Sequence, residues 1–232
     1  MYTITGRNKL GLLEKYLSSQ GKQKTILDIG GTKYDLEFIE NQGFKNVTIA
    51  NNSEAELEGC YKKKAKFDIT TSHLNKKYDI ILFLDVIEHL IDPDSAIENI
   101  KCMMKSSSVL IITTPNLACL FNRVFLLLGW SLPNYTPSKI KTGNPLMKAK
   151  VGSSFRNSFS HKSVFTYKQL KELMAAYGFK IIKTQGYHYG LMQGDEGGGN
   201  YGRIRSIVNS FSPTKLKEGI FLIVKKGGIE WF

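Results

Sequence analysis

The stretch that decides the fold is ILDIGGTKYD, residues Ile26–Asp35. It reads as a short apolar strand that carries an acid, Asp28, followed by two glycines and a polar run. A strand with this ending needs either a sharp turn or a backbone that a ligand can approach closely, because glycine adopts positive φ and has no Cβ. The glycine pair alone favours the simple turn, so the rest of the chain has to decide.

Strands and helices alternate on both sides of this turn. We expect strands at 25–29, 46–50, 65–69, 78–84, 108–114, 179–187 and 219–226. Helix starts are indicated by Asp92 before Pro93 and by the capping-box spacings Thr166 to Gln169 and Ser53 to Glu56. The pattern predicts an α/β fold: a doubly wound, Rossmann-like, mostly parallel seven-stranded sheet with an antiparallel edge strand.

In such a sheet, ligands bind beyond the carboxyl ends of the strands, which is where Gly30 and Gly31 lie. A dinucleotide fingerprint fits poorly, because Thr32 and Asp35 stand where that pattern requires glycines. Asp28 comes before the turn, where a carboxylate can accept hydrogen bonds from a cationic ligand group. These residues favour a ligand site of another kind.

Further motifs follow in order: FDIT, YDIILFLDVIEHLIDP and LIITTPN. Together with ILDIGGTKYDLEFI they resemble the motifs of class I S-adenosylmethionine-dependent methyltransferases, and DVIEHL is the most specific of them. HKSVFTYKQLKELMAAYGFKIIKTQGY is similar to the C-terminal half of the small-molecule members. The resemblance covers about residues 22–190 and the final strand, and implies S-adenosyl-L-methionine as the cofactor.

The resemblance implies a cofactor site at the ends of the first four strands. The expected cofactor-binding residues are Asp28, Gly30, Gly31, Thr32, Asn51, Asp68, Ile69, Asp85 and Val86. The residues of the glycine turn would line the methionine and ribose part, Asp68 would face the adenine amino group beside Ile69, and Asp85 would face both cofactor and acceptor. Glu88 and His89 would shape the pocket floor.

Two positions depart from the family pattern. Thr32 stands where a second glycine is usual, and Asn51 where an acid usually binds both ribose hydroxyls. An uncharged amide makes a weaker hydrogen bond than a carboxylate. We therefore expect modest affinity for the cofactor.

Methyl transfer is an in-line displacement, and a base is needed only when the acceptor must lose a proton. His161, His89 and His188 are the candidates; His161 is favoured because it opens the HKSVFT segment. The alternative is a histidine that caps a turn or is exposed. No metal site is predicted, since Asp195 and Glu196 in the glycine-rich loop do not make one by themselves.

The chain of 232 residues has 32 basic and 20 acidic side chains, a formal charge of +12. No Asp or Glu occurs from Asn99 to Lys171, whereas eleven Lys and Arg do. This segment is either a solvated basic face or a site for an anionic partner. Within it, an insertion at about 116–160 begins with an apolar helical stripe; core or homodimer packing, a lid over the acceptor and a membrane-surface contact are the alternatives.

We predict a single methyltransferase domain over 1–232, in the cytoplasm, with no transmembrane segment or signal peptide. The cysteines Cys60, Cys102 and Cys119 form no disulfide framework. The expected reaction is methyl transfer from S-adenosylmethionine to a small anionic, sugar-linked or lipid-linked acceptor. The basic segment leaves an RNA methyltransferase as an alternative, and Thr32 and Asn51 leave a non-catalytic member of the fold.

Overall fold

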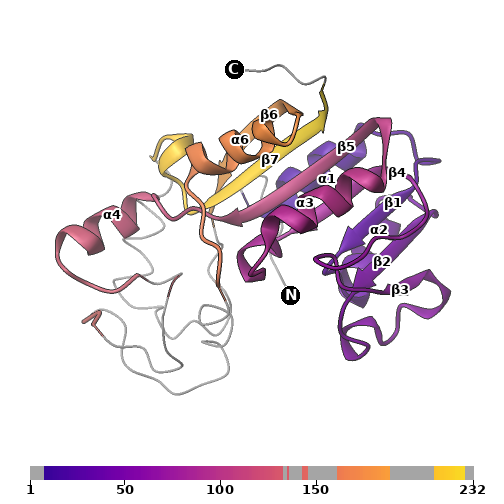
Figure 1. Cartoon of the computed structure of the whole chain (residues 1–232), viewed down its shortest axis with the longest axis horizontal. Helices are drawn as coiled ribbons and strands as arrows, with labels where there is room; N and C mark the ends of the chain where they lie inside the picture. The colour runs from indigo at the N-terminus through magenta and orange to yellow at the C-terminus, as the bar shows by residue number, and fades with distance from the viewer. Residues whose placement is uncertain (1–7, 133–134, 136–142, 146–160, 189–211, 228–232) are drawn as a thin grey trace.

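The computed structural model describes residues 8–132, 135, 143–145, 161–188 and 212–227. Its centre is a seven-stranded sheet with the order β3-β2-β1-β4-β5-β7-β6 (Figure 1). The strands are β1 (Ile26–Ile29), β2 (Val47–Asn51), β3 (Lys64–Lys66), β4 (Tyr78–Leu84), β5 (Met104–Pro115), β6 (Phe179–Tyr187) and β7 (Gly219–Lys226). β7 is antiparallel to both of its neighbours, β5 and β6, whereas the other strand pairs are parallel. The mostly parallel sheet with an antiparallel strand near one edge is confirmed; β6 lies outside that strand.

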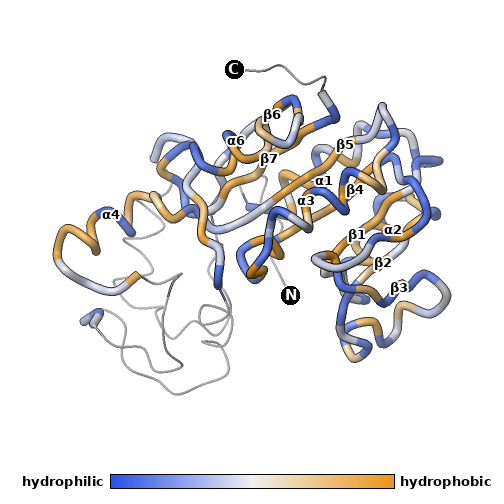
Figure 2. The backbone as a smooth tube through the Cα atoms, viewed as in Figure 1, coloured by the Kyte–Doolittle hydropathy of each residue, from blue (hydrophilic) through white to orange (hydrophobic). Residues whose placement is uncertain are grey.

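Helices cover both faces of the sheet. They are α1 (Lys9–Ser18), α2 (Lys33–Asn41), α3 (Pro93–Cys102), α4 (Leu120–Leu127) and α6 (Tyr167–Ala176), with short 3-10 helices η1 (Ala55–Leu57), η2 (Tyr61–Lys63), η3 (Ile87–His89) and η5 (Thr214–Leu216). Buried side chains of α3 and α6 pack on one face, and those of α1 and α2 on the other. The central strands are apolar along most of their length (Figure 2), as expected of strands buried on both faces.

Two of the three helix starts indicated by the sequence are confirmed. Asp92 accepts a hydrogen bond from the Ser95 amide (3.0 Å), and Thr166 and Gln169 form a capping box at α6. The prediction of a helix that starts at Ser53 is wrong, because only the short 3-10 helix η1 forms there. The Ser53 amide donates to the Asn51 side chain (3.1 Å) instead of starting a helix.

The insertion at about 116–160, for which core or homodimer packing, a lid and a membrane-surface contact are the alternatives, lies mostly outside the described residues. Its described helix, α4, buries Asn122 and Phe125 and exposes Leu126 and Leu127. The described ranges contain no helix of the length and apolarity needed to cross a bilayer.

Asp79 anchors β4 to its surroundings. Its carboxylate accepts hydrogen bonds from the Thr25 amide (2.9 Å), the Thr25 hydroxyl (2.7 Å) and the Lys105 ammonium (2.6 Å). Burial alone would raise the pKa of Asp79, but the bonds from Lys105 and Thr25 outweigh it and lower the pKa to about 2. The unfolded carboxyl titrates near 3.9. Folded protein therefore binds fewer protons in this range, and stability is lost as the pH falls from about 4 toward 2.

Replacing Asp79 with Asn should lower the free energy of unfolding at pH 7 by about 1–2 kcal/mol, because the charge that accepts three hydrogen bonds is gone. Urea unfolding at pH 7 and at pH 3 measures this. The difference between wild type and Asp79→Asn should shrink at pH 3. A difference that stays constant with pH would contradict this role.

Candidate active site

Asp28 lies near the carboxyl end of β1 and is 2% exposed. Its Oδ2 atom has no hydrogen-bond partner among the described residues. Burial raises the pKa of the Asp28 carboxyl well above its usual value; the charge of Asp35 adds to this and Lys9 opposes it. A buried acceptor without a donor is costly unless a ligand supplies one.

The glycine turn after β1 is packed by the chain itself. Gly30 has φ +82°, and a Cβ there would lie 2.4 Å from Val86 Cγ2. A Cβ on Gly31 would lie 2.3 Å from Asp28 Oδ2. The close contacts with Val86 and Asp28 therefore leave no room for a Cβ at either position. The chain's own packing requires both glycines, whether or not a ligand also approaches the turn. The turn brings Asp28 of β1 and Val86, which follows the neighbouring strand β4, to one place at the carboxyl end of the sheet.

Thr32 and Asn51 support this turn. Thr32 is the N-cap of α2, and its amide and hydroxyl donate to Asp35 Oδ2 (2.8 and 2.9 Å). Asn51 ends β2, and its Nδ2 donates to the Gly31 carbonyl (3.2 Å) while its Oδ1 accepts from Ser53. Asn51 therefore lies beside the glycine turn, and its side-chain amide is bonded within the protein.

Asp68 and Ile69 follow β3. The exposed Asp68 closes its own turn, since its Oδ1 accepts from the Thr70 amide (2.9 Å) and hydroxyl (2.7 Å). Ile69 is buried, and its carbonyl accepts from Asn99 Nδ2 (2.8 Å). Both residues lie in the loop after β3, the strand that pairs with β2.

Asp85 directly follows β4 and has a left-handed backbone, φ +55°, which is unusual for a residue other than glycine. Its carboxylate binds the Lys9 ammonium (2.7 Å), the Thr113 hydroxyl (2.8 Å) and the Tyr187 hydroxyl (2.9 Å). Burial would raise the pKa of Asp85, but the Lys9 charge and these hydrogen bonds lower it. The sequence interpretation missed Lys9 and Tyr187, for which no local signal exists.

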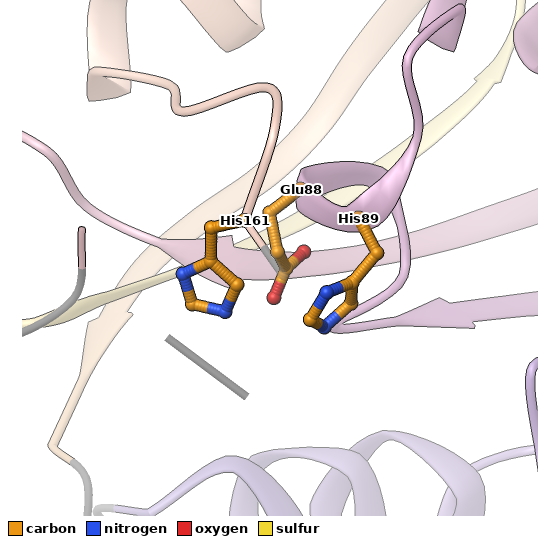
Figure 3. Close-up of side chains that lie close together, drawn as sticks. All are labelled: Glu88, His89 and His161. Carbon is orange, nitrogen blue, oxygen red and sulfur yellow. The ribbon is translucent and has the colours of Figure 1, made fainter. Parts of the chain in front are cut away.

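Glu88, His89 and His161 form the second group of polar side chains (Figure 3). Glu88 is 1% exposed, and its Oε2 accepts from the Thr114 hydroxyl (3.0 Å). Burial raises the pKa of Glu88 well above its usual value, and the Asp85 charge adds to this. The rings of His89 and His161 meet edge to face, with centroids 4.8 Å apart. The structure thus brings together two of the three histidines that the sequence offered as bases; the third, His188, lies after β6 and is not part of this group.

A model of a methyltransferase domain matches residues 6–184. The chain belongs to this methyltransferase family. The strand order and the motif resemblance to class I S-adenosylmethionine-dependent methyltransferases agree with this match. A search of curated proteins found no match.

Solved structures of several methyltransferases share the fold of this chain. An S-adenosylmethionine-dependent methyltransferase from Archaeoglobus fulgidus is 18% identical, with a TM-score of 0.58 over 94% of this chain and 92% of that one. One from Clostridium acetobutylicum is 15% identical, with a TM-score of 0.59 over 98% and 93%. Magnesium protoporphyrin IX methyltransferase from Synechocystis, crystallised with S-adenosylhomocysteine (SAH), is 14% identical, with a TM-score of 0.55 over 94% and 82%.

Proposed function

We propose that this protein is an S-adenosylmethionine-dependent methyltransferase with a small anionic, sugar-linked or lipid-linked acceptor. The observation that supports it best is the buried Asp28 carboxylate at the glycine turn, in a chain of the methyltransferase family. S-adenosylmethionine supplies a methyl group on a sulfonium, together with amino and hydroxyl donors. Such donors are what the Asp28 Oδ2 atom lacks among the described residues.

The remaining cofactor contacts are proposed from position. Gly30 and Gly31 would present backbone to the cofactor, Asn51 would face its ribose, and Asp68 with Ile69 would face its adenine. Because the Asn51 amide already binds Gly31 and Ser53, it would contribute less to binding than a free carboxylate.

The acceptor class is inferred from charge. The basic segment 99–171 has no acid and eleven cations, and Lys162 follows His161 directly. An anionic group on the acceptor would be attracted to these cations. His161 or His89 would then take a proton from the acceptor where one must be lost.

Asn51 also favours a second candidate, a cofactor-binding member of the fold without methyl transfer. Turnover separates the two candidates: methyl transfer to any member of a panel of acids, phenols, sugars and lipids excludes the second one.

Calorimetric titration with SAH tests cofactor binding, which both candidate functions require. We expect saturable binding of one SAH per chain, with a dissociation constant of about 10–100 µM because of Asn51. Absence of binding at about 1 mM SAH would contradict the proposed function.

A further inference from the structure

Glu88, His89 and His161 are held together by the backbone. The amides of Lys162 and Ser163 donate to the Glu88 carbonyl (2.6 and 3.0 Å), and the Ser163 hydroxyl donates to the Leu90 carbonyl (2.7 Å). These bonds join the segment before α6 to η3, so the meeting of the three side chains is built into the fold. Figure 3 shows the carboxylate between the two imidazoles, all three facing a common space.

The group places a buried carboxylate beside two imidazole rings. The Glu88 carboxylate is buried, with Asp85 as a second acid nearby. Lys9, the cation that acts on both acids, lies 2.7 Å from Asp85 and forms an ion pair with it. Buried carboxylates are commonly paired with a cation or bound to a metal. The imidazole rings of His89 and His161 offer nitrogen atoms of the kind that bind metals.

We propose that Glu88, His89 and His161 bind one divalent transition-metal ion, and that this ion holds an oxygen atom of the methyl acceptor. Two imidazole nitrogens and one carboxylate oxygen are a ligand set of catalytic zinc and iron sites, which keep further positions open. Imidazole donors favour Zn²⁺, Fe²⁺, Co²⁺ or Ni²⁺ over Mg²⁺ and Ca²⁺, which prefer oxygen ligands.

The three donor atoms are close enough for one ion if the side chains move together. They lie within 4.8 Å of one another. Donors at about 2.1 Å from a tetrahedral ion are about 3.4 Å apart, so the widest pair must approach by up to about 1.4 Å. His89 and His161 are partly exposed, so their side chains have room to rotate toward the ion.

The role of the ion rests on the proposed function. Val86, which packs on Gly30, precedes Glu88 by two residues, so the group lies at the same end of β4 as the glycine turn. A metal-bound hydroxyl has a lowered pKa. The acceptor oxygen would release its proton to water and form the new O–C bond with its lone pair, while the C–S bond breaks and leaves both electrons on sulfur. His89 and His161 are then ligands, and no separate base is required.

Metal binding is tested with untagged, EDTA-treated protein titrated with Co²⁺, whose visible absorption reports imidazole ligands, and with Zn²⁺ by calorimetry. We expect one ion per chain, and at least about tenfold weaker binding in His161→Ala and Glu88→Gln. His73→Ala is the matched control: it removes a histidine that contacts Asn99 on the surface, and it should bind as wild type. Circular dichroism and SAH titration establish that each variant is folded.

The outcomes separate the two proposals. SAH binding with no Co²⁺ or Zn²⁺ binding at about 100 µM, or equal weakening by His73→Ala, overturns the metal site and leaves the methyltransferase function standing. Metal binding lost only in His161→Ala and Glu88→Gln supports the site even when SAH does not bind, and the proposed function then fails alone. For the role of the ion, transfer to a hydroxyl acceptor should stop with EDTA and return with Co²⁺ or Zn²⁺. Transfer that EDTA leaves unchanged overturns this role.

Discussion

Replacing Asp28 with Asn should stabilise the unliganded protein and weaken SAH binding by at least about tenfold. The substitution keeps the shape of the side chain but removes a buried carboxylate whose Oδ2 has no donor among the described residues. Relief of that burial cost favours the folded state. Loss of a charge-assisted hydrogen bond to the ligand is worth about 1.5–3 kcal/mol, which is about tenfold or more in the dissociation constant.

The measurement pairs thermal unfolding without ligand with SAH calorimetry. Asp79→Asn is the control, because it replaces a carboxylate that the protein itself satisfies, and it should lose stability without losing SAH affinity. The contributions of Asp28 and Asp79 to stability change with pH in opposite directions. The raised pKa of Asp28 means that the folded state binds more protons than the unfolded state above about pH 4, so its contribution to stability falls as the pH rises. An Asp28→Asn variant that is less stable and binds SAH normally would show that Asp28 is purely structural.

The elements that the sequence predicted well are those with purely local causes. β4 is a continuous apolar run, and its observed bounds are the predicted ones. α3 and α6 begin at side-chain caps, Asp92 and Thr166, whose hydrogen bonds reach only three residues along the chain. The capping-box spacing at Ser53 failed because another local bond, from its amide to Asn51, takes precedence.

Contacts between distant segments could not be predicted this way. Asp85 binds Lys9 from α1 and Tyr187 from β6, which are 76 and 102 residues away along the chain and are brought to it only by the fold. Likewise, His161 reaches Glu88 through backbone bonds that no motif records. The sequence offered both histidines separately as bases, whereas their shared position beside a buried carboxylate is a property of the fold.

Replacing Gly30 with Ala should destabilise the protein by about 3 kcal/mol and abolish measurable SAH binding. Two costs add: the left-handed backbone, about 1 kcal/mol for alanine, and a Cβ placed 2.4 Å from Val86 Cγ2, about 1–3 kcal/mol. Gly178→Ala isolates the first cost, because Gly178 also has a positive φ, +75°, but nothing lies within 4 Å of its added Cβ.

A double-mutant cycle with Val86→Ala isolates the second cost, since it removes Cγ2 and leaves the Val86 Cβ at 3.6 Å, an ordinary contact. In that background Gly30→Ala should cost only about 1 kcal/mol, close to Gly178→Ala. If the cost of Gly30→Ala is the same with and without Val86→Ala, steric contact between the β1 turn and the β4 end does not explain the glycine. The positive φ of Gly30 and closeness to a bound ligand would then be the remaining reasons.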